Sequence, residues 1–144
     1  EALAANAALT LFIPMRMDTG GNSGGQASVT VIRAMSLGDV EFSDCFRVLW
    51  KELRVALLCS VTLGAVVFLK VILLDRKSIA VALVVALTIM VTIVVAKLVG
   101  CTLPMLAKKI GFDPAVMASP FITTIVDALS LLIYFTIATH ILNL

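Results

Sequence analysis

The chain has 144 residues, of which 61% are hydrophobic and only 14% are charged. Soluble domains are typically about 45–50% apolar and about 25% charged, and a soluble protein of this size cannot bury so much apolar surface in its own core. The net charge is +2, and the basic residues are scattered without interleaved aromatic residues, which excludes a nucleic-acid-binding surface. The composition therefore predicts an integral membrane protein embedded in a lipid bilayer.

The first part of the chain consists of two apolar segments separated by a glycine-rich one. Residues 2–17 and 27–37 are apolar, and residues 18–26 read Asp-Thr-Gly-Gly-Asn-Ser-Gly-Gly-Gln. Each apolar segment alone is too short to cross about 30 Å of hydrocarbon, but the three segments joined as one helix are long enough. The sequence is compatible with one helix that has a glycine-rich middle or with a broken helix.

Three further apolar segments follow a stretch of mixed polarity. In residues 38–54, aromatic and aliphatic residues recur at helical spacing among charged ones, which predicts an amphipathic interfacial helix. Residues 55–74, 78–106 and 120–142 are each long and apolar enough to span a bilayer. We therefore expect an all-α integral membrane protein, a bundle of about four transmembrane helices plus an amphipathic connector helix.

The basic residues of the short loops indicate an orientation. If the spans alternate in direction, one side holds Arg47, Lys51, Arg54, Lys108 and Lys109, and the other holds Arg76 and Lys77. The excess of positive charge places the first side in the cytoplasm, in a multi-pass protein of the cell (plasma or inner) membrane. Both ends of the chain then lie outside, so we expect a further helix to precede Glu1 in a longer protein.

Asp127 lies inside the last apolar segment. A carboxylate in the hydrocarbon costs at least about 2.5–3.5 kcal/mol, and such residues usually face water, a cation or a proton path. Hydroxyl groups of Ser119, Thr123, Thr124 and Ser130 surround it in the sequence. These hard oxygen atoms favour a hydrated alkali or alkaline-earth cation over zinc or copper. A structural alternative is a buried ion pair with Lys97 in the neighbouring span.

The glycine-rich segment has a structural and a functional interpretation, and the two are compatible. Gly20, Gly24 and Ser28 form one ladder of small residues at a spacing of four, and Gly21 and Gly25 form another. Such ladders allow helices to approach closely. In the functional reading, Asn22 and Gln26 present their amide oxygens to a pore.

Two charged residues at the start of this segment need separate interpretation. Asp18-Thr19-Gly20 spells the aspartic-protease triad, but those enzymes need two carboxylates that share a proton on β-rich turns. No strand pattern surrounds this triad, so we expect no enzyme activity. Arg16 and Arg33 flank the glycine-rich segment and are candidates to pair with Asp18 or with lipid phosphate, and we expect Arg16 to point away from any cation path.

Four segments together resemble a known family. Residues 14–26 (Pro-Met-Arg-Met-Asp-Thr-Gly-Gly-Asn-Ser-Gly-Gly-Gln) and 119–135 are similar to the membrane domain of the MgtE-type magnesium channels, and the patterns in 31–38 and 98–104 agree. The resemblance covers nearly the whole chain. It implies five membrane helices per subunit, of which residues 1–144 correspond to helices two to five without the first. The cytosolic N-terminal and CBS sensor domains of the family are not in this sequence.

The resemblance also implies a function and an assembly. The family forms homodimers whose pore follows the subunit interface, lined by helices two and five, and its last-helix aspartate binds a largely hydrated magnesium ion. Asp127 matches that aspartate, and residues 38–50 match the cytosolic juncture below the pore. The implied metal site comprises Asp127, Thr123, Thr124, Ser119, Asn22 and Gly21. Ser119 departs from an amide found in some members, which affects the ranking of Mg²⁺ against Mn²⁺, Co²⁺, Ni²⁺ and Ca²⁺.

The sequence is compatible with two kinds of transport protein. The leading one is the pore domain of a magnesium-selective channel that passes hydrated divalent cations down the membrane potential. The alternative is a secondary exchanger of divalent cations for protons or sodium, in which Asp127 alternates between proton and metal. The lack of a visible inverted repeat of the Asp127 helix argues against the exchanger. A purely structural dimerisation module would give no reason to keep Asp127 in the membrane.

Overall fold

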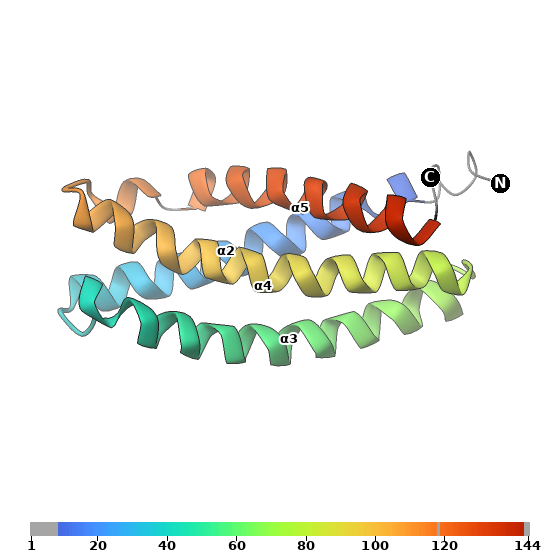
Figure 1. Ribbon diagram of the computed structural model, residues 1–144, viewed down its shortest axis with the longest axis horizontal. Coiled ribbons are helices and arrows are strands. Elements are labelled where there is room, and N and C mark those ends of the chain that lie inside the picture. Colours follow the sequence, from blue (N-terminus) through green and yellow to red (C-terminus); the bar gives the residue numbers. More distant parts are fainter. Residues whose placement is uncertain (1–8, 118, 143–144) are drawn as a thin grey trace.

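The computed structural model describes residues 9–117 and 119–142, and within them it is helical without any strand. The elements are α2 (Ile13–Ser36), the short 3-10 helix η1 (Phe42–Asp44), α3 (Cys45–Leu73), α4 (Ile79–Lys109), the 3-10 helix η2 (Pro114–Met117) and α5 (Ser119–Leu142). Figure 1 shows the four long helices side by side, with the α2–α3 and α4–α5 connections at one end and the α3–α4 turn at the other. The predicted all-α membrane bundle is confirmed.

The glycine-rich segment is continuous helix, so the broken-helix alternative is wrong. α2 runs unbroken from Ile13 to Ser36 over 24 residues, which corresponds to about 36 Å at 1.5 Å per residue. Figure 1 shows α2 running along the length of the bundle. In the described part of the chain, three helical stretches are long and apolar enough to cross a membrane by composition, and they are Phe42–Leu73, Ile79–Lys109 and Pro120–Leu142.

α2 ends in a Schellman-type turn that its sequence specifies. Gly38 has a φ of +78°, a left-handed conformation that glycine adopts without steric cost. The amide of Asp39 donates to the carbonyl of Ala34 at 2.9 Å. From the end of α4, the Nζ of Lys108 donates to the carbonyl of Met35 at 3.2 Å. The end of α2 is thereby fixed against the end of α4.

The amphipathic connector is not a separate helix. After η1, the chain enters α3 at Cys45 and continues without a break to Leu73. The amide of Glu41 donates to Oδ2 of Asp44 at 3.2 Å, which satisfies one of the free amides at this entry. The polar residues of the predicted connector therefore occupy the first turns of the second long helix.

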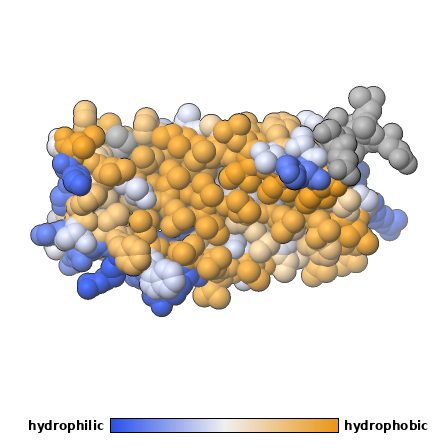
Figure 2. Space-filling view, in the orientation of Figure 1, coloured by the Kyte–Doolittle hydropathy of each residue, from blue (hydrophilic) through white to orange (hydrophobic). Residues whose placement is uncertain are grey.

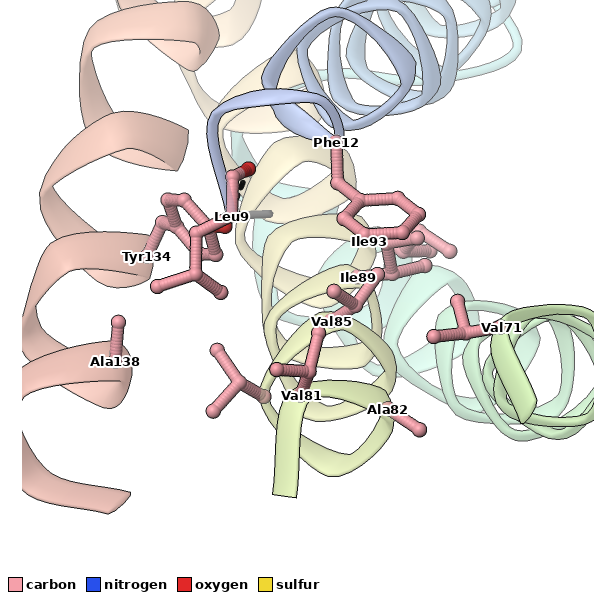
Figure 3. Packing of buried hydrophobic residues seen from close by; sticks show 11 residues of the cluster. Leu9, Phe12, Val71, Val81, Ala82, Val85, Ile89, Ile93, Tyr134 and Ala138 are labelled. Carbon is pink, nitrogen blue, oxygen red and sulfur yellow. Dashed lines mark hydrogen bonds between the residues drawn. The ribbon is translucent and has the colours of Figure 1, made fainter. Parts of the chain in front are cut away.

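α4 is the central helix of the bundle. In the most apolar stretch of each span, 56% is buried inside the bundle for α4, against 22% for the α3 span and 28% for α5. Its residues Val81, Val85 and Ile89 pack with residues of all three other helices in one core cluster. Figure 3 shows these side chains between Tyr134 of α5 and Val71 of α3. Large apolar side chains on the outer faces of α3 and α5 remain exposed in the single subunit.

Glycines bring α2 into direct backbone contact with α4. A Cβ atom placed on Gly100 of α4 would overlap the carbonyl oxygen of Gly24 and lie 3.0 Å from its carbonyl carbon. A Cβ atom on Gly20 would lie 2.7 Å from Cγ2 of Thr92 in α4 and 3.2 Å from Cγ1 of Val126 in α5. The ladder of small residues thus seats α2 in the groove between α4 and α5, as the close-packing reading predicts.

Candidate functional site

Asp127 lies where α5 crosses α2, and glycine makes room for it. A Cβ atom on Gly21 would be 3.6 Å from Oδ1 of Asp127 and 3.2 Å from Cγ2 of Thr123. The Asp127 side chain is half-buried, and its Oδ1 atom is buried without a hydrogen-bond partner in the described part of the chain. A buried carboxylate oxygen without a donor is costly. The site therefore has unused capacity to accept hydrogen bonds.

Two threonines place further oxygen atoms beside Asp127. Thr123 and Thr124 both donate to the carbonyl of Pro120, at 3.0 and 2.9 Å. Because each hydroxyl proton is used within the helix, the lone pairs of both oxygens remain able to accept hydrogen bonds from water around an ion. The side chain of Ser119 lies outside the described residues. Ser130, the fourth predicted hydroxyl, is buried, and its Oγ has no partner in the described part.

α2 contributes an exposed polar stripe on the same side. Asp18, Asn22 and Gln26 are exposed at a spacing of four residues, so they lie above one another on one helix face. Beside them runs a groove of about 210 Å³ lined by Gly21, Asn22, Gly25, Gln26 and Val29. The predicted pore-facing amides thus lie on the surface of this subunit.

Asp18 lies on the same stripe, although its sequence pattern suggested only a protease triad or a partner for Arg16. Its side chain is exposed, as are those of Asn22 and Gln26. The spacing of Asp18 to Asn22, one helical turn, is the signal that would have found it. Two carboxylates near one polar groove raise the local attraction for cations.

The alternative ion pair between Asp127 and Lys97 is wrong. The Nζ of Lys97 lies 3.2 Å from Oε2 of Glu52 in α3, and their side chains are 13% and 14% exposed. Glu52 precedes the apolar segment of its span, so in the sequence it falls in the predicted connector and does not stand out as a partner for Lys97. Because α3 continues the connector as one helix, Glu52 faces α4 inside the bundle. Lys97 is thereby satisfied without Asp127.

Arg16 points away from the polar stripe, as predicted. Its side chain is 1% exposed, and Cζ lies 3.0 Å from the centroid of the Tyr134 ring. Its Nε donates to the carbonyl of Phe12 at 3.2 Å, and the Tyr134 hydroxyl donates to the carbonyl of Leu9 at 2.7 Å. The ring, rather than Asp18, is the counterpart of this cation, in a cation–π contact.

The arrangement can attract a cation but does not provide a closed cage for a dehydrated one. Among the described residues, no three of the metal-ligating types His, Cys, Asp and Glu are grouped so that they could hold a metal ion. Asp127, with neutral oxygens on either side, matches the way Mg²⁺ is commonly held, by one or two carboxylates with several waters retained.

Comparison with known proteins identifies the family. The family model described as MgtE, divalent cation transporter, matches residues 13–137. This match includes α2, α3 and α4 completely and most of α5. The chain belongs to the MgtE family of divalent cation transporters. A transporter family agrees with the rejection of protease chemistry at Asp18.

Several MgtE proteins are similar to almost the whole chain. Identity is 36% over 143 residues to the magnesium transporter MgtE of Thermus thermophilus, covering 99% of this chain and 31% of that protein. The magnesium transporters MgtE of Enterococcus faecalis and Bacillus subtilis are 34% and 31% identical, over 96% and 99% of this chain. The chain spans about a third of the length of these MgtE relatives.

Proposed function

We propose that residues 1–144 form the pore domain of a magnesium channel, with Asp127 at its ion site. One observation carries the proposal: the unpartnered carboxylate oxygen of Asp127 is placed against Gly21 beside an exposed polar stripe. A membrane helix with a polar outer stripe is stable where that stripe faces water or protein rather than lipid. The MgtE relatives named as magnesium transporters support Mg²⁺ as the ion.

The ion is held mostly through its water shell. Mg²⁺ loses water reluctantly and keeps several waters when carboxylates bind it. Asp127 supplies the charge, and Thr123, Thr124, Ser119, Asn22 and Gly21 supply neutral oxygens that accept hydrogen bonds from those waters. An ion bound in this outer-sphere manner is released readily, as conduction requires. Mn²⁺, Co²⁺, Ni²⁺ and Ca²⁺ are the expected competitors.

A second copy of the chain completes the pore in this proposal. The polar stripe of α2 and the hydroxyls of α5 share one surface of the subunit, so a two-fold axis beside them places two Asp127 side chains opposite each other. Paired carboxylates in a narrow passage select cations over anions. Across the cell membrane, the inside-negative potential drives a divalent ion inward by about 4.6 kcal/mol per 100 mV, at about 2.3 kcal/mol per charge.

Single-channel recording in planar bilayers tests the transport mechanism. We expect unitary Mg²⁺ currents that reverse at the Mg²⁺ equilibrium potential and need no proton or sodium gradient. Currents that vanish without a counter-gradient, or flux in strict exchange for protons or sodium, would establish the alternative, a secondary exchanger.

Cysteine cross-linking tests the dimer separately from the transport mechanism. In a background with Cys45, Cys59 and Cys101 replaced by alanine, we expect Asn22→Cys to form disulfide-linked dimers on mild oxidation in liposomes. The matched control is Leu58→Cys, since Leu58 is 73% exposed on the outer face of α3. Cross-linking at position 58 but not at position 22 would place the subunit contact on α3 instead of α2 and would contradict the proposed dimer.

A further inference from the structure

The first turns of α3 carry three exposed basic side chains, two of which have no acidic partner in the described part of the chain. Arg47, Lys51 and Arg54 are exposed at a spacing of four and three residues, so they share one face of the helix. The Arg47 side chain is 88% exposed and lies 3.7 Å from Asp44. Lys51 and Arg54 have no ion pair or hydrogen bond with any described residue. Figure 2 shows hydrophilic residues gathered at this end of the bundle.

Aromatic side chains lie beside this basic stripe. Phe46 is 80% exposed and Trp50 is 53% exposed, and they are one helical turn apart on α3. Leu57, seven residues beyond Trp50, continues the same face and is 49% exposed. Tryptophan next to arginine and lysine at the end of a membrane helix is typical of the level of the lipid headgroups. The first turns of α3 therefore lie at the level of the lipid headgroups.

An apolar groove begins one turn deeper in the membrane, between α3 and α4. It has a volume of about 250 Å³ and is lined by Leu57, Ser60, Met90, Val91, Val94 and Val95. Leu57 is three residues past Arg54, a rise of about 4.5 Å along the helix axis. Leu57 thus connects the face that carries Phe46 and Trp50 to the groove, which begins about one turn deeper than Arg54.

We propose that this surface binds one anionic phospholipid per subunit. Its phosphate contacts Arg54 and Arg47, its glycerol region lies against Trp50, and one acyl chain fills the groove between α3 and α4. Charge selects this occupant. A zwitterionic headgroup would bring its own cation beside the unpaired Lys51 and Arg54 and the exposed Arg47, and a second copy of this surface would bring like charges together. The site lies on α3 and α4, so it does not depend on the function proposed for Asp127.

Trp50 is the only tryptophan in the chain, so its fluorescence reports on this site. The experiment places the full chain in phosphatidylcholine bilayers and adds small equal fractions of dibrominated phosphatidylglycerol or dibrominated phosphatidylcholine, whose bromine atoms quench tryptophan at contact. We expect stronger quenching by the anionic lipid, with a relative affinity that falls roughly fivefold for each arginine removed in Arg54→Gln and Arg47→Gln. Arg54→Lys, which keeps the charge, should retain most of the preference.

The controls are Arg33→Gln on α2 and Arg76→Gln at the opposite end of the bundle, which should leave the preference unchanged. Three outcomes would overturn the proposal. Equal quenching by both lipids would mean that no anionic lipid is selected. A preference that survives the double variant Arg47→Gln/Arg54→Gln would place the charge recognition elsewhere. Quenching by neither lipid would mean that protein, from a second copy or another segment, covers Trp50.

Discussion

The backbone contact between Gly24 and Gly100 allows a sharp test of how α2 is held in the bundle. The Cβ atom of Gly100→Ala would overlap the carbonyl oxygen of Gly24 and lie within 3.0–3.1 Å of its carbonyl carbon and Cα. These are backbone atoms of a continuous helix, so they cannot rotate out of the way. To accept the methyl group, α2 and α4 must move apart along their whole crossing.

The magnitude follows from two opposing contributions. Replacing glycine by alanine inside a helix stabilises it by about 1 kcal/mol. Overpacking a tight core costs typically about 1–3 kcal/mol, and contact with backbone places this position at the upper end. The expected net loss in the free energy of unfolding is about 1–2 kcal/mol, a factor of roughly 5–30 in the ratio of folded to unfolded protein.

Gly64→Ala is the matched control. Its Cβ atom would lie 2.6 Å from Cγ and 2.8 Å from Sδ of Met90, which belong to a flexible side chain that can adopt another rotamer. We therefore expect Gly64→Ala to be close to neutral. Both variants are measured by equilibrium unfolding in mixed detergent micelles. Equal stability of the two variants would refute the argument that the backbone contact limits the approach of α2.

Three further predictions concern single contacts. Lys97→Met alone should cost about 3–5 kcal/mol by leaving Glu52 buried and unpaired, whereas Lys97→Met/Glu52→Leu should recover most of the loss; equal unfolding free energies of the single and double variants would contradict the pair. Tyr134→Phe should cost about 1 kcal/mol, because it removes a buried hydroxyl that donates to a backbone carbonyl; an unchanged unfolding midpoint would show that this bond adds nothing. Gly21→Leu should abolish Mg²⁺ flux in liposomes by displacing Thr123, which lies 3.2 Å from the Cβ position, whereas Ser43→Leu at an exposed position should not; normal flux in Gly21→Leu would make the crossing incidental.

Much of the fold follows from the sequence because membrane helices must satisfy their own backbone. Long apolar runs separated by short polar loops specified the spans, and the loop at residues 75–77 lies where the composition places it. The continuity of α2 was not predictable. Glycine weakens a helix in isolation, and only the close approach to α4 at Gly100 shows why this helix stays intact.

The candidate site was predicted in part for a similar reason. Asp127 can be recognised from the sequence alone because a carboxylate in an apolar segment is rare. Its neighbour across the crossing, Gly21, and the charge of Asp18 depend on how α2 and α5 are placed in space. The pairing of Lys97 with Glu52 depends on the register of α3 against α4. It could not be predicted from composition, which places Glu52 in the connector and outside the span that begins at residue 55.

Magnesium flux through Asp127→Asn tests the central claim most directly. The amide keeps the size and much of the hydrogen bonding of the carboxylate but removes its charge, so a hydrated divalent cation loses its main attraction. The matched control is Asp39→Asn, an exposed aspartate in the turn after α2. With dimer content and unfolding free energy unchanged, we predict that flux into liposomes falls to background in Asp127→Asn and stays at the wild-type rate in Asp39→Asn. Wild-type flux through Asp127→Asn would contradict the assignment of the ion site.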